Sequence, residues 1–493
     1  MLTLENFIAG RHRPSISGGT IPVYEPATGE LYAAVPDSTQ TDVEHAVAAA
    51  HAAFPAWAAT PAAERSRLLL RLADLIDANL DALARAESRD TGKPIALARA
   101  VDIPRSAANV RHFATAILHS STQAHDFDGG GVPGGVPAFN YTKRTPRGVA
   151  ACISPWNLPL YLLTWKLSPA LATGNTVVAK PSEVTPVTAW MLSGLAADAG
   201  FPPGVLNIIH GSGLGAGAPL VNHPLVPAVT FTGSTPVGQW IGEACGRTLK
   251  RCSLELGGKN PFVIFEDADL DTPGGAIDTA ARAAFTNQGQ ICLCGSRLLV
   301  HESMYQRVVA GLVDRARFLR AADPLDPATR FGAITSKAQF DKVSRMVHDA
   351  KASGGQILAG GRPVPASDLP ERCRAGWFYE PTVIAGLDPA CPAEQEEIFG
   401  PVVTVRPFKD EPHAAALANG TPYGLAATVF TRDVARAHRV AAAIDAGIVW
   451  VNCWMVRDLR TPFGGTRQSG IGREGGDEAL RFFTEPKNIC IGL

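Results

Sequence analysis

The spacing of apolar residues predicts a helical N-terminal part followed by two stretches in which strands and helices alternate. Apolar positions recur at helical intervals after residue 41, where Thr41 and Glu44 have the spacing of a capping box. A second stripe begins after Thr60-Pro61, with proline suited to the first helical position, and continues as far as Leu80. We therefore expect two helices here, and a third from about residue 102 to 118.

From residue 147 onward, short apolar runs alternate with helical patterns. This alternation predicts a mostly parallel sheet covered by helices on both faces. In such sheets, ligands bind beyond the carboxyl ends of the strands. Asn157, Lys180, Ser234 and Glu255 are expected at that edge. The predicted strands are 148–153, 176–180, 205–209, 228–231 and 253–256.

A second alternating stretch predicts a second α/β domain, with strands at 261–265, 296–300, 402–405 and 427–430. The Gly- and Pro-rich residues 127–139 interrupt the pattern, Asn140–Arg144 alternates like an edge strand, and 486–493 reads as an extended tail. Exposed edges need partners, so we expect a homodimer or homotetramer. The expected division is a Rossmann-like cofactor domain (1–126 and 147–257), a catalytic α/β domain (258–470) and a small β oligomerisation element (127–146 and 471–493).

Composition narrows the function classes. A chain of 493 residues is too long for a single hydrophobic core, so more than one domain is expected. The 45 basic and 46 acidic side chains give a net charge of −1, and no run of basic residues is present. We therefore expect neither nucleic acid nor a membrane surface as a partner. Glu5 stands where a signal peptide would carry basic residues. Nine cysteines without a regular framework favour reduced thiols, and we expect a cytoplasmic protein.

Cys292 follows a glycine and polar amides in the segment Phe285 to Cys292. A cysteine after a helix is most often buried packing, but here a nucleophile is a second interpretation. Cys294 completes a C-x-C pair that could belong to a metal site. Because no matching His/Cys pair appears elsewhere, we predict no metal.

Glu255 ends an apolar strand just before Gly257-Gly258-Lys259. Burying a charged carboxylate is costly, so its pKa should rise. Two interpretations stay open at this point: a buried carboxylate satisfied by backbone N–H groups, and a general base that activates water.

Two glycine-containing turns are candidates for binding a cofactor. Gly211 to Ala216 matches G-x-G-x-x-A after a strand, which is a weak signal on its own. Phe231 to Gly238 places Gly, Ser and Thr between a strand and a helix start. Such a turn directs N–H groups toward an anion such as a pyrophosphate, although an ordinary capped turn has the same pattern.

Taken together, these segments resemble the aldehyde dehydrogenase superfamily over nearly the whole chain, in the family's order. The motifs that carry the resemblance are Ile153-Ser154-Pro155-Trp156-Asn157, Lys180-Pro181-Ser182-Glu183, Gly233-Ser234-Thr235, Glu255-Leu256-Gly257-Gly258-Lys259, Gly289-Gln290-Ile291-Cys292 and Glu397-Ile398-Phe399-Gly400-Pro401.

The resemblance implies NAD-dependent oxidation of an aldehyde to a carboxylic acid. By this analogy Cys292 is the nucleophile, Asn157 and the Cys292 backbone N–H bind the oxyanion, and Glu255 activates water to hydrolyse the thioester. Lys166 and Glu474 match positions that relay the proton. The implied NAD-binding positions are Ile153, Pro155, Trp156, Lys180, Ser182, Glu183, Gly213, Gly217, Phe231, Gly233, Ser234, Val237, Leu256, Glu397 and Phe399.

A narrower similarity joins three segments to the 2-aminomuconic and 2-hydroxymuconic semialdehyde dehydrogenases: 154–166, 291–294 and 452–459. It implies a carboxylate-bearing aldehyde as substrate. We expect Arg111 and Arg457 to bind that carboxylate, with Arg105 as a competitor for the place of Arg111, and an ion pair of Arg457 with Asp458 as the structural alternative.

Three other functions stay open from the sequence. One is a non-acylating aldehyde dehydrogenase with a different substrate. Another is a CoA-acylating semialdehyde dehydrogenase, against which Glu255 argues. The third is a catalytically silent protein of the same fold, against which Cys292, Asn157 and Glu255 argue.

Overall fold

The computed structural model describes residues 1–131 and 133–493; Val132, within the expected 127–146 segment, lies outside the described residues. The N-terminal helices are α1 (Gln40–Ala59), α2 (Ala62–Ala78), α3 (Leu80–Thr91), the short α4 (Ile95–Leu97) and α5 (Ile103–Ala116). Two expectations were wrong in detail. Thr39 and Asp42, not Thr41 and Glu44, form the capping box of α1. Leu80 begins a separate helix after Asn79 instead of ending α2.

The first large sheet has eight strands, and its five central strands are parallel. All five strands expected between 148 and 256 are present within one or two residues. The short strands that complete the sheet, β22 at one edge and β2 and β3 at the other, pair antiparallel. The strand order is β22 (Gly470–Ile471), β12 (Arg251–Glu255), β11 (Ala228–Thr232), β8 (Val149–Ile153), β9 (Thr176–Lys180), β10 (Leu206–Ile208), β2 (Asn6–Ile8) and β3 (Arg11–Arg13).

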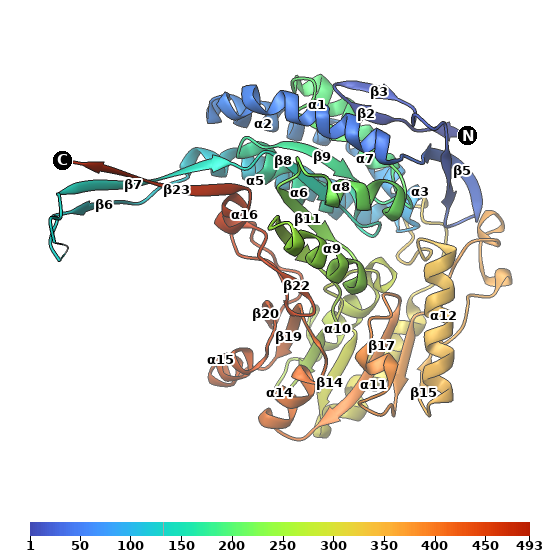
Figure 1. The fold of residues 1–493 in the computed structure, drawn as a ribbon. Helices are drawn as coiled ribbons and strands as arrows, with labels where there is room; N and C mark the ends of the chain where they lie inside the picture. The colour runs from blue at the N-terminus through green and yellow to red at the C-terminus, as the bar shows by residue number, and fades with distance from the viewer. Residues whose placement is uncertain (132) are drawn as a thin grey trace.

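Helices cover both faces of this sheet, as expected for a parallel α/β fold (Figure 1). One face packs apolar side chains of α2, α5, α6 (Pro159–Ala172), α7 (Val187–Ala199) and α16 (Gly476–Phe482). The other packs α1, α8 (Ala218–Asn222) and α9 (Thr235–Arg247). Because both faces are covered, the open edge at the carboxyl ends of the strands is where a ligand can approach.

The second sheet has seven strands, all parallel except β15 at one edge. Its order is β15 (Gln356–Ala359), β16 (Thr382–Ala385), β17 (Val402–Phe408), β14 (Arg297–His301), β13 (Pro261–Ile264), β19 (Ala426–Phe430) and β20 (Ile448–Val451). The helices of this half are α10 (Ala276–Phe285), α11 (Tyr305–Phe318), α12 (Lys337–Ala352), α13 (Pro392–Gln395), α14 (Glu411–Asn419) and α15 (Val434–Ala443). This second α/β unit was also expected.

A three-stranded sheet projects from the body as an arm that carries the C-terminus (Figure 1). It consists of β6 (Ala124–Phe127), β7 (Ala138–Pro146) and β23 (Thr484–Gly492). The expectation of an edge strand at Asn140–Arg144 was wrong, because β7 is the middle strand and pairs antiparallel with β23 and β6. Two minor sheets complete the fold: β1 (Leu2–Thr3), β5 (Glu30–Pro36) and β4 (Thr20–Glu25), and the pair β18 (Tyr423–Gly424) and β21 (Thr466–Arg467).

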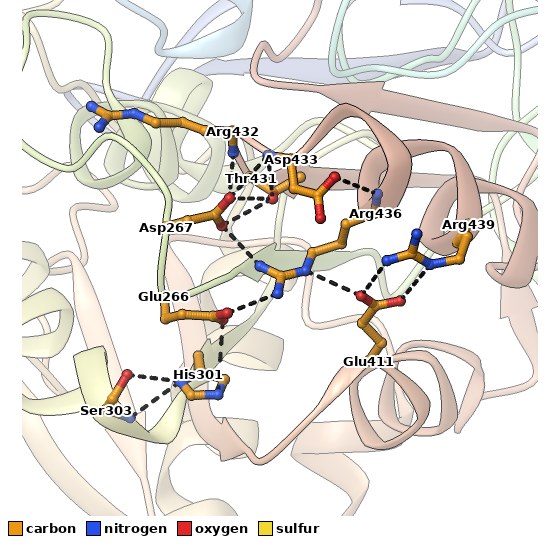
Figure 2. Close-up of polar contacts among 10 residues, drawn as sticks. All are labelled: Glu266, Asp267, His301, Ser303, Glu411, Thr431, Arg432, Asp433, Arg436 and Arg439. Carbon is orange, nitrogen blue, oxygen red and sulfur yellow. Dashed lines mark hydrogen bonds and ion pairs between the residues drawn. The ribbon is translucent and has the colours of Figure 1, made fainter.

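An ion-pair network around Arg436 of α15 ties together three elements of the second unit (Figure 2). Its guanidinium contacts Glu266 at 2.8 Å and Asp267 at 3.0 Å, both after β13, and Glu411 of α14 at 3.2 Å. The Asp267 carboxylate also accepts hydrogen bonds from the Thr431 hydroxyl and the backbone N–H groups of Arg432 and Asp433. These contacts fix the loop that follows β19. In the described part of the chain, no helix is long and apolar enough to cross a membrane.

Candidate active site

The two α/β units meet at a cavity beyond the carboxyl ends of β8, β11 and β12. Nine residues expected at the site from the sequence line it together: Pro155, Trp156, Asn157, Gly233, Ser234, Leu256, Cys292, Glu397 and Phe399. Five further lining residues were not expected: Leu162, Thr232, Gly257, Gln339 and Lys342. Segments more than two hundred residues apart in the chain therefore meet at one place.

A tight turn after α10 presents Cys292 to this cavity. Asn287 and Gln288 both have left-handed backbone conformations, with φ of 52° and 54°. Gly289 follows at φ 69°, and a Cβ there would lie 2.0 Å from the Gly400 carbonyl oxygen, so only glycine fits. Asn260 Nδ2 then holds the Cys292 carbonyl oxygen at 2.7 Å. The turn thus fixes the direction of the thiol.

The surroundings of the Cys292 thiol favour its neutral, protonated form. Burial raises its pKa well above the ordinary value, and the carboxylates of Glu397 and Glu255 raise it further, while Arg457 acts in the opposite direction. A base or a cation beside the thiol is therefore needed to form the thiolate.

Asn157 lies beside the Cys292 turn. It follows β8, its side chain is buried, and its Nδ2 donates to the Gln290 carbonyl oxygen at 2.9 Å. Its own carbonyl oxygen accepts from Asn287 Nδ2 at 3.2 Å. The amide N–H groups are thus held within the turn that carries the thiol, a position suited to hydrogen bonding an oxygen that develops charge there.

Glu255, at the end of β12, is buried, and in the described part of the chain neither carboxylate oxygen has a hydrogen-bond partner. Burial raises its pKa well above the usual range and nearby Glu474 adds to the shift, while Lys166, Arg457 and Arg473 oppose it. An unpaired carboxyl group with a raised pKa binds a proton more readily than an ordinary glutamate, which suits it to act as a general base.

The two residues expected to relay a proton are in contact. Lys166 Nζ lies 2.7 Å from Glu474 Oε1 and 3.0 Å from the Thr230 hydroxyl, which itself donates to Glu474 at 3.1 Å. Glu474 is also the group whose charge raises the pKa of Glu255. Lys166, Thr230 and Glu474 therefore form a buried polar cluster near Glu255, although no direct hydrogen bond joins the cluster to the Glu255 carboxylate in the described structure.

Several expected cofactor positions line the open edge of the first sheet. Lys180 Nζ pairs with Glu183 Oε2 at 3.0 Å, and Gly217 lies against the Lys180 stem. Gly213–Gly217 forms a π-helical turn that Ser212 caps. Ile153 and Phe231 are buried at the strand ends, the Ser182 hydroxyl accepts from the Val184 N–H, and Val237 is exposed on the first turn of α9.

The N-terminus of α9 is open. Ser234 is its N-cap residue but makes no side-chain cap hydrogen bond, and the Thr232 hydroxyl before it is buried without a partner in the described structure. A Cβ on Gly233 would lie 2.3 Å from the Phe231 ring, so glycine is required for the close turn. Unsatisfied N–H groups and a free hydroxyl at a helix N-terminus suit an anionic ligand.

Glu397 reaches across from the second unit. Its Oε1 accepts from the Gly258 N–H at 3.0 Å, and a Cβ on Gly257 would lie 2.2 Å from its Oε2. Burial raises the pKa of Glu397 to about 6, against the effect of the Gly258 hydrogen bond and of Lys342 and Lys259. The two glycines therefore allow a carboxylate to approach the backbone at the cavity wall.

Two residues of α12 brace this loop. Gln339 Nε2 donates to the carbonyl oxygens of Ile398 and Phe399, and Lys342 Nζ donates to that of Glu397. They hold Phe399 at a φ of 57° with its ring 5.2 Å from that of Trp156, edge to face. Nothing in the helical pattern of 337–352 distinguished these two polar residues from a solvated helix face.

Arg457, which was expected to bind the substrate carboxylate, lies beside Tyr161 of α6 and is not one of the described residues that line the cavity. Its Nη1 lies 3.1 Å from the Tyr161 hydroxyl and its guanidinium carbon lies 3.8 Å from the centre of the Phe463 ring. The alternative ion pair with Asp458 is not formed, because Asp458 pairs with Arg460 at 2.6 Å. The positive charge of Arg457 acts to lower the pKa values of Cys292 and Glu255, against the larger opposite effect of burial.

The expectation for Arg111 is not supported. Arg111 points away from the cavity and pairs with Asp74 and Asp77 of α2, each at 2.6 Å. Arg105, six residues earlier on α5, instead lies over the Tyr161 ring at 5.7 Å, and its Nε and Nη2 are buried without a partner in the described structure. The physical reason is helical geometry: six residues place the two side chains well apart around the axis.

Among the residues that the structure describes, no group of three or more His, Cys, Asp or Glu side chains is arranged to hold a metal ion.

Comparison with known proteins agrees with this geometry. The aldehyde dehydrogenase family matches residues 12–489. The chain is 50% identical to the 2-aminomuconic semialdehyde dehydrogenase of Danio rerio, covering 99% of this chain and 98% of that one, and 45% identical to the 2-hydroxymuconic semialdehyde dehydrogenase of Pseudomonas sp. strain CF600, covering 100% of both. The crystal structure of the betaine aldehyde dehydrogenase of Staphylococcus aureus in complex with NAD+ is 35% identical, with a TM-score of 0.94 over 100% of this chain and 95% of that chain. The chain therefore belongs to the aldehyde dehydrogenase family of enzymes.

Proposed function

We propose that this enzyme uses NAD+ to oxidise an aldehyde that carries a carboxylate, such as 2-aminomuconic or 2-hydroxymuconic semialdehyde, to the corresponding acid. The observation that carries the substrate class is the pair of guanidinium groups at Tyr161. Arg105 lies over the ring of Tyr161 and Arg457 contacts its hydroxyl, and neither arginine forms an ion pair in the described structure.

Two partly buried cations side by side are unfavourable unless an anion joins them. Burial and the charge of Arg457 lower the pKa of Arg105, although Tyr161 and Asp458 oppose the shift. A substrate carboxylate supplies the missing charge, and a planar guanidinium binds it with two parallel hydrogen bonds. The aldehyde at the other end of the substrate then points along α6 toward Cys292, because Leu162, next to Tyr161, lines the same cavity as Cys292.

The residues supply each step of the oxidation. The Cys292 thiol first gives its proton to water, a step that the positive charges of Arg457 and of bound NAD+ would favour. The thiolate then attacks the aldehyde carbon, and the oxygen that becomes negative accepts hydrogen bonds from the Asn157 amide and the Cys292 N–H. Loss of a hydride from the thiohemiacetal carbon leaves a thioester on Cys292. Glu255 takes a proton from water, the hydroxide attacks the thioester, and the acid leaves as the thiol re-forms. Glu474, whose carboxylate is held by the Lys166 ammonium group and the Thr230 hydroxyl, would then take the proton from Glu255.

The open edge of the first sheet fits a dinucleotide. The uncapped N-terminus of α9 and the unpartnered Thr232 hydroxyl suit a pyrophosphate, and the Gly257 backbone allows Glu397 to face a ribose. When bound, NAD+ supplies the acceptor for the hydride. Lys180 and Glu183 would hold the adenosine ribose. Because Glu183 would repel a 2′-phosphate, we propose NAD+ as the preferred cofactor over NADP+.

The three-stranded arm supports the proposal for assembly, a homodimer or homotetramer joined through the arm. All four residues of β6 are exposed, and its outer edge is unpaired. Phe127, Phe139 and Ile491 add exposed apolar surface to the arm. An unpaired edge with apolar side chains favours pairing with a second copy, and light scattering after gel filtration measures the resulting mass.

A substrate panel tests the proposal. Purified enzyme is given aldehydes of matched length that end in a carboxylate, an amide or a methyl group, with NAD+ or NADP+, and kcat/KM is measured from NADH formation. We expect the carboxylate-bearing aldehyde and NAD+ to be preferred and the product to be the free acid. A preference for neutral aldehydes would refute the substrate class. If product forms only when CoA is present, the acyl group is transferred from Cys292 to the CoA thiol and is not released by hydrolysis.

A further inference from the structure

Lys93 is a fully buried lysine outside the described cavity. It follows α3 in the turn 92–94, where Gly92 ends the helix at a φ of 76° and the Ser88 hydroxyl donates to the Lys93 carbonyl oxygen at 2.6 Å. The side chain of Lys93 has no solvent exposure. Burying an ammonium group is costly, so it must be stabilised by partners within the protein.

Three acceptors surround the ammonium group. Lys93 Nζ contacts the carboxylate of Asp102, lies 3.6 Å from Glu87, and donates to the main-chain carbonyl oxygen of Asn157 at 3.0 Å. Both carboxylates are buried, and burial raises the pKa of each, although the charge of Lys93 opposes the shift. The Asn157 carbonyl is thus the neutral third partner of a buried ion cluster.

Asn157 is the residue proposed to bind the substrate oxyanion, and its peptide is held by two donors. Lys93 Nζ contacts its carbonyl oxygen from the first unit and Asn287 Nδ2 contacts it from the second. A hydrogen bond to a charged donor is roughly twice as strong as a neutral one. Lys93 is therefore the stronger of the two contacts that fix this peptide.

A second chain of contacts links the same turn to the nucleophile's loop. The Thr91 carbonyl oxygen, two residues before Lys93, accepts from the Thr335 hydroxyl at 2.8 Å. The Thr335 N–H donates to the Gln290 side chain at 3.1 Å, and the Gln290 carbonyl oxygen accepts from Asn157 Nδ2. The end of α3 thus contacts both the backbone of Asn157 and the loop that its amide faces.

We propose that Lys93 is a positioning residue for catalysis, whose ammonium group fixes the Asn157 peptide so that the side-chain amide meets the developing oxyanion on the substrate. The inference rests on the proposed function, because Lys93 affects the rate only through Asn157, and Asn157 binds an oxyanion only in the proposed reaction. A misplacement of about 1 Å in a catalytic group can cost about a hundredfold in rate. The loss should therefore fall on kcat, with little change in the KM for NAD+.

Substitution of Lys93 alone would leave the buried carboxylates of Asp102 and Glu87 without their cation, which destabilises the fold. The test therefore uses the paired variant Lys93→Met with Asp102→Asn, which removes the ammonium group and the carboxylate in direct contact with it and keeps side chains of similar size. Glu87 keeps its hydrogen bond from the Thr188 hydroxyl in this variant. We expect the paired variant to keep a near-normal unfolding midpoint and to lose about ten- to a hundredfold in kcat, with the KM for NAD+ within about twofold.

Coupling to Asn157 separates positioning from a general structural effect. In an Asn157→Ala background the same pair of substitutions should cost less than about threefold, because residues that act through one another are not additive. Lys250→Met is the matched control: Lys250 Nζ also donates to two carbonyl oxygens, those of Val221 and His223, but far from the cavity. That variant should keep the wild-type kcat.

The outcomes are distinct. A paired variant with wild-type kcat, or with the same loss in the Asn157→Ala background, would overturn the role of Lys93 while leaving the proposed function intact. An equal loss of kcat in Lys250→Met would mean that the loss in the paired variant comes from general destabilisation, and this result would also overturn the role of Lys93. A wild type that oxidises no aldehyde would overturn the proposed function and this inference together.

Discussion

Replacing Arg105 by methionine keeps an unbranched apolar stem over the Tyr161 ring and removes the buried guanidinium. In the structure this guanidinium makes no ion pair, and its Nε and Nη2 lack partners among the described residues, so no intramolecular ion pair is lost with it. What is lost is the contact with the substrate carboxylate. The effect should therefore depend on whether the substrate carries that carboxylate.

The size of the effect follows from the kind of contact. A hydrogen bond to a charged group is worth about 1.5–3 kcal/mol, and each 1.4 kcal/mol is about a factor of ten, so kcat/KM for a carboxylate-bearing aldehyde should fall about 10- to 150-fold. Loss of the stack over Tyr161 removes about 0.5–1 kcal/mol from the stability of the folded protein, and any effect of this loss on the site is shared by the charged and neutral substrates. The ratio of kcat/KM between the charged and neutral aldehydes isolates the first contribution.

The assay follows NADH absorbance for wild type, Arg105→Met and Arg111→Ala with a semialdehyde acid and its methyl-terminated analogue. Arg111→Ala is the matched control, since this arginine lies on the same helix but pairs with Asp74 and Asp77 at the surface. It should leave the ratio unchanged. Equal losses for both substrates in Arg105→Met, or a changed ratio in Arg111→Ala, would refute the assignment.

Three other predictions concern the cofactor side and the fold. Gly257→Ala places a Cβ 2.2 Å from Glu397 Oε2, so the Glu397 carboxylate must move. The KM for NAD+ should then rise about tenfold, which titration of cofactor binding would measure. An unchanged KM would mean that Glu397 does not hold the ribose. Because Glu397 must be ionised to accept a ribose hydroxyl and burial raises its pKa to about 6, the KM for NAD+ should rise as the pH falls through 6, and a flat profile would contradict this. Asp267→Asn should lower the free energy of unfolding by about 2 kcal/mol at pH 7, because four hydrogen bonds to the carboxylate are weakened or lost (Figure 2). Burial acts against ionisation of Asp267, but hydrogen bonds from Thr431 and the following backbone N–H groups lower its folded pKa. Its stabilising effect is therefore present above the unfolded pKa of about 3.9 and is lost as the pH falls through the folded value; a difference in stability that does not shrink as the pH is lowered below about 3.9 would contradict the mechanism.

The positions of the central strands along the chain could be predicted from the sequence, since each rests on a local pattern. Buried strands of parallel sheets are continuous apolar runs, and β9 was predicted at its observed bounds, Thr176–Lys180. The motifs around Cys292, Asn157 and Glu397 could be joined because their family resemblance already implies one cavity. No local pattern alone would place residues 157 and 397 together.

The errors arose where two positions carried equal local signals. Thr39 with Asp42 and Thr41 with Glu44 both have the capping-box spacing, and only the packing of α1 selects the first pair. Arg105 and Arg111 are both arginines on one predicted helix, and a 3.6-residue period separates their faces without saying which one faces the cavity. Lys93 carried no signal, because the Asp102 and Asn157 contacts that define it lie outside its own turn.

The central claim is that oxidation passes through a thioester on Cys292 which Glu255 helps to hydrolyse. Substituting Glu255→Ala removes the base but leaves the thiol and the Asn157 amide in place, so hydride loss should proceed and hydrolysis should stall. The most direct measurement is the intact mass of Glu255→Ala after brief mixing with NAD+ and a carboxylate-bearing aldehyde, followed by peptide mapping. The account predicts one acyl group per chain, on the peptide that contains Cys292, and about one equivalent of NADH formed in a burst. An unmodified Cys292 with continued turnover, or an acyl group on another cysteine, would contradict it.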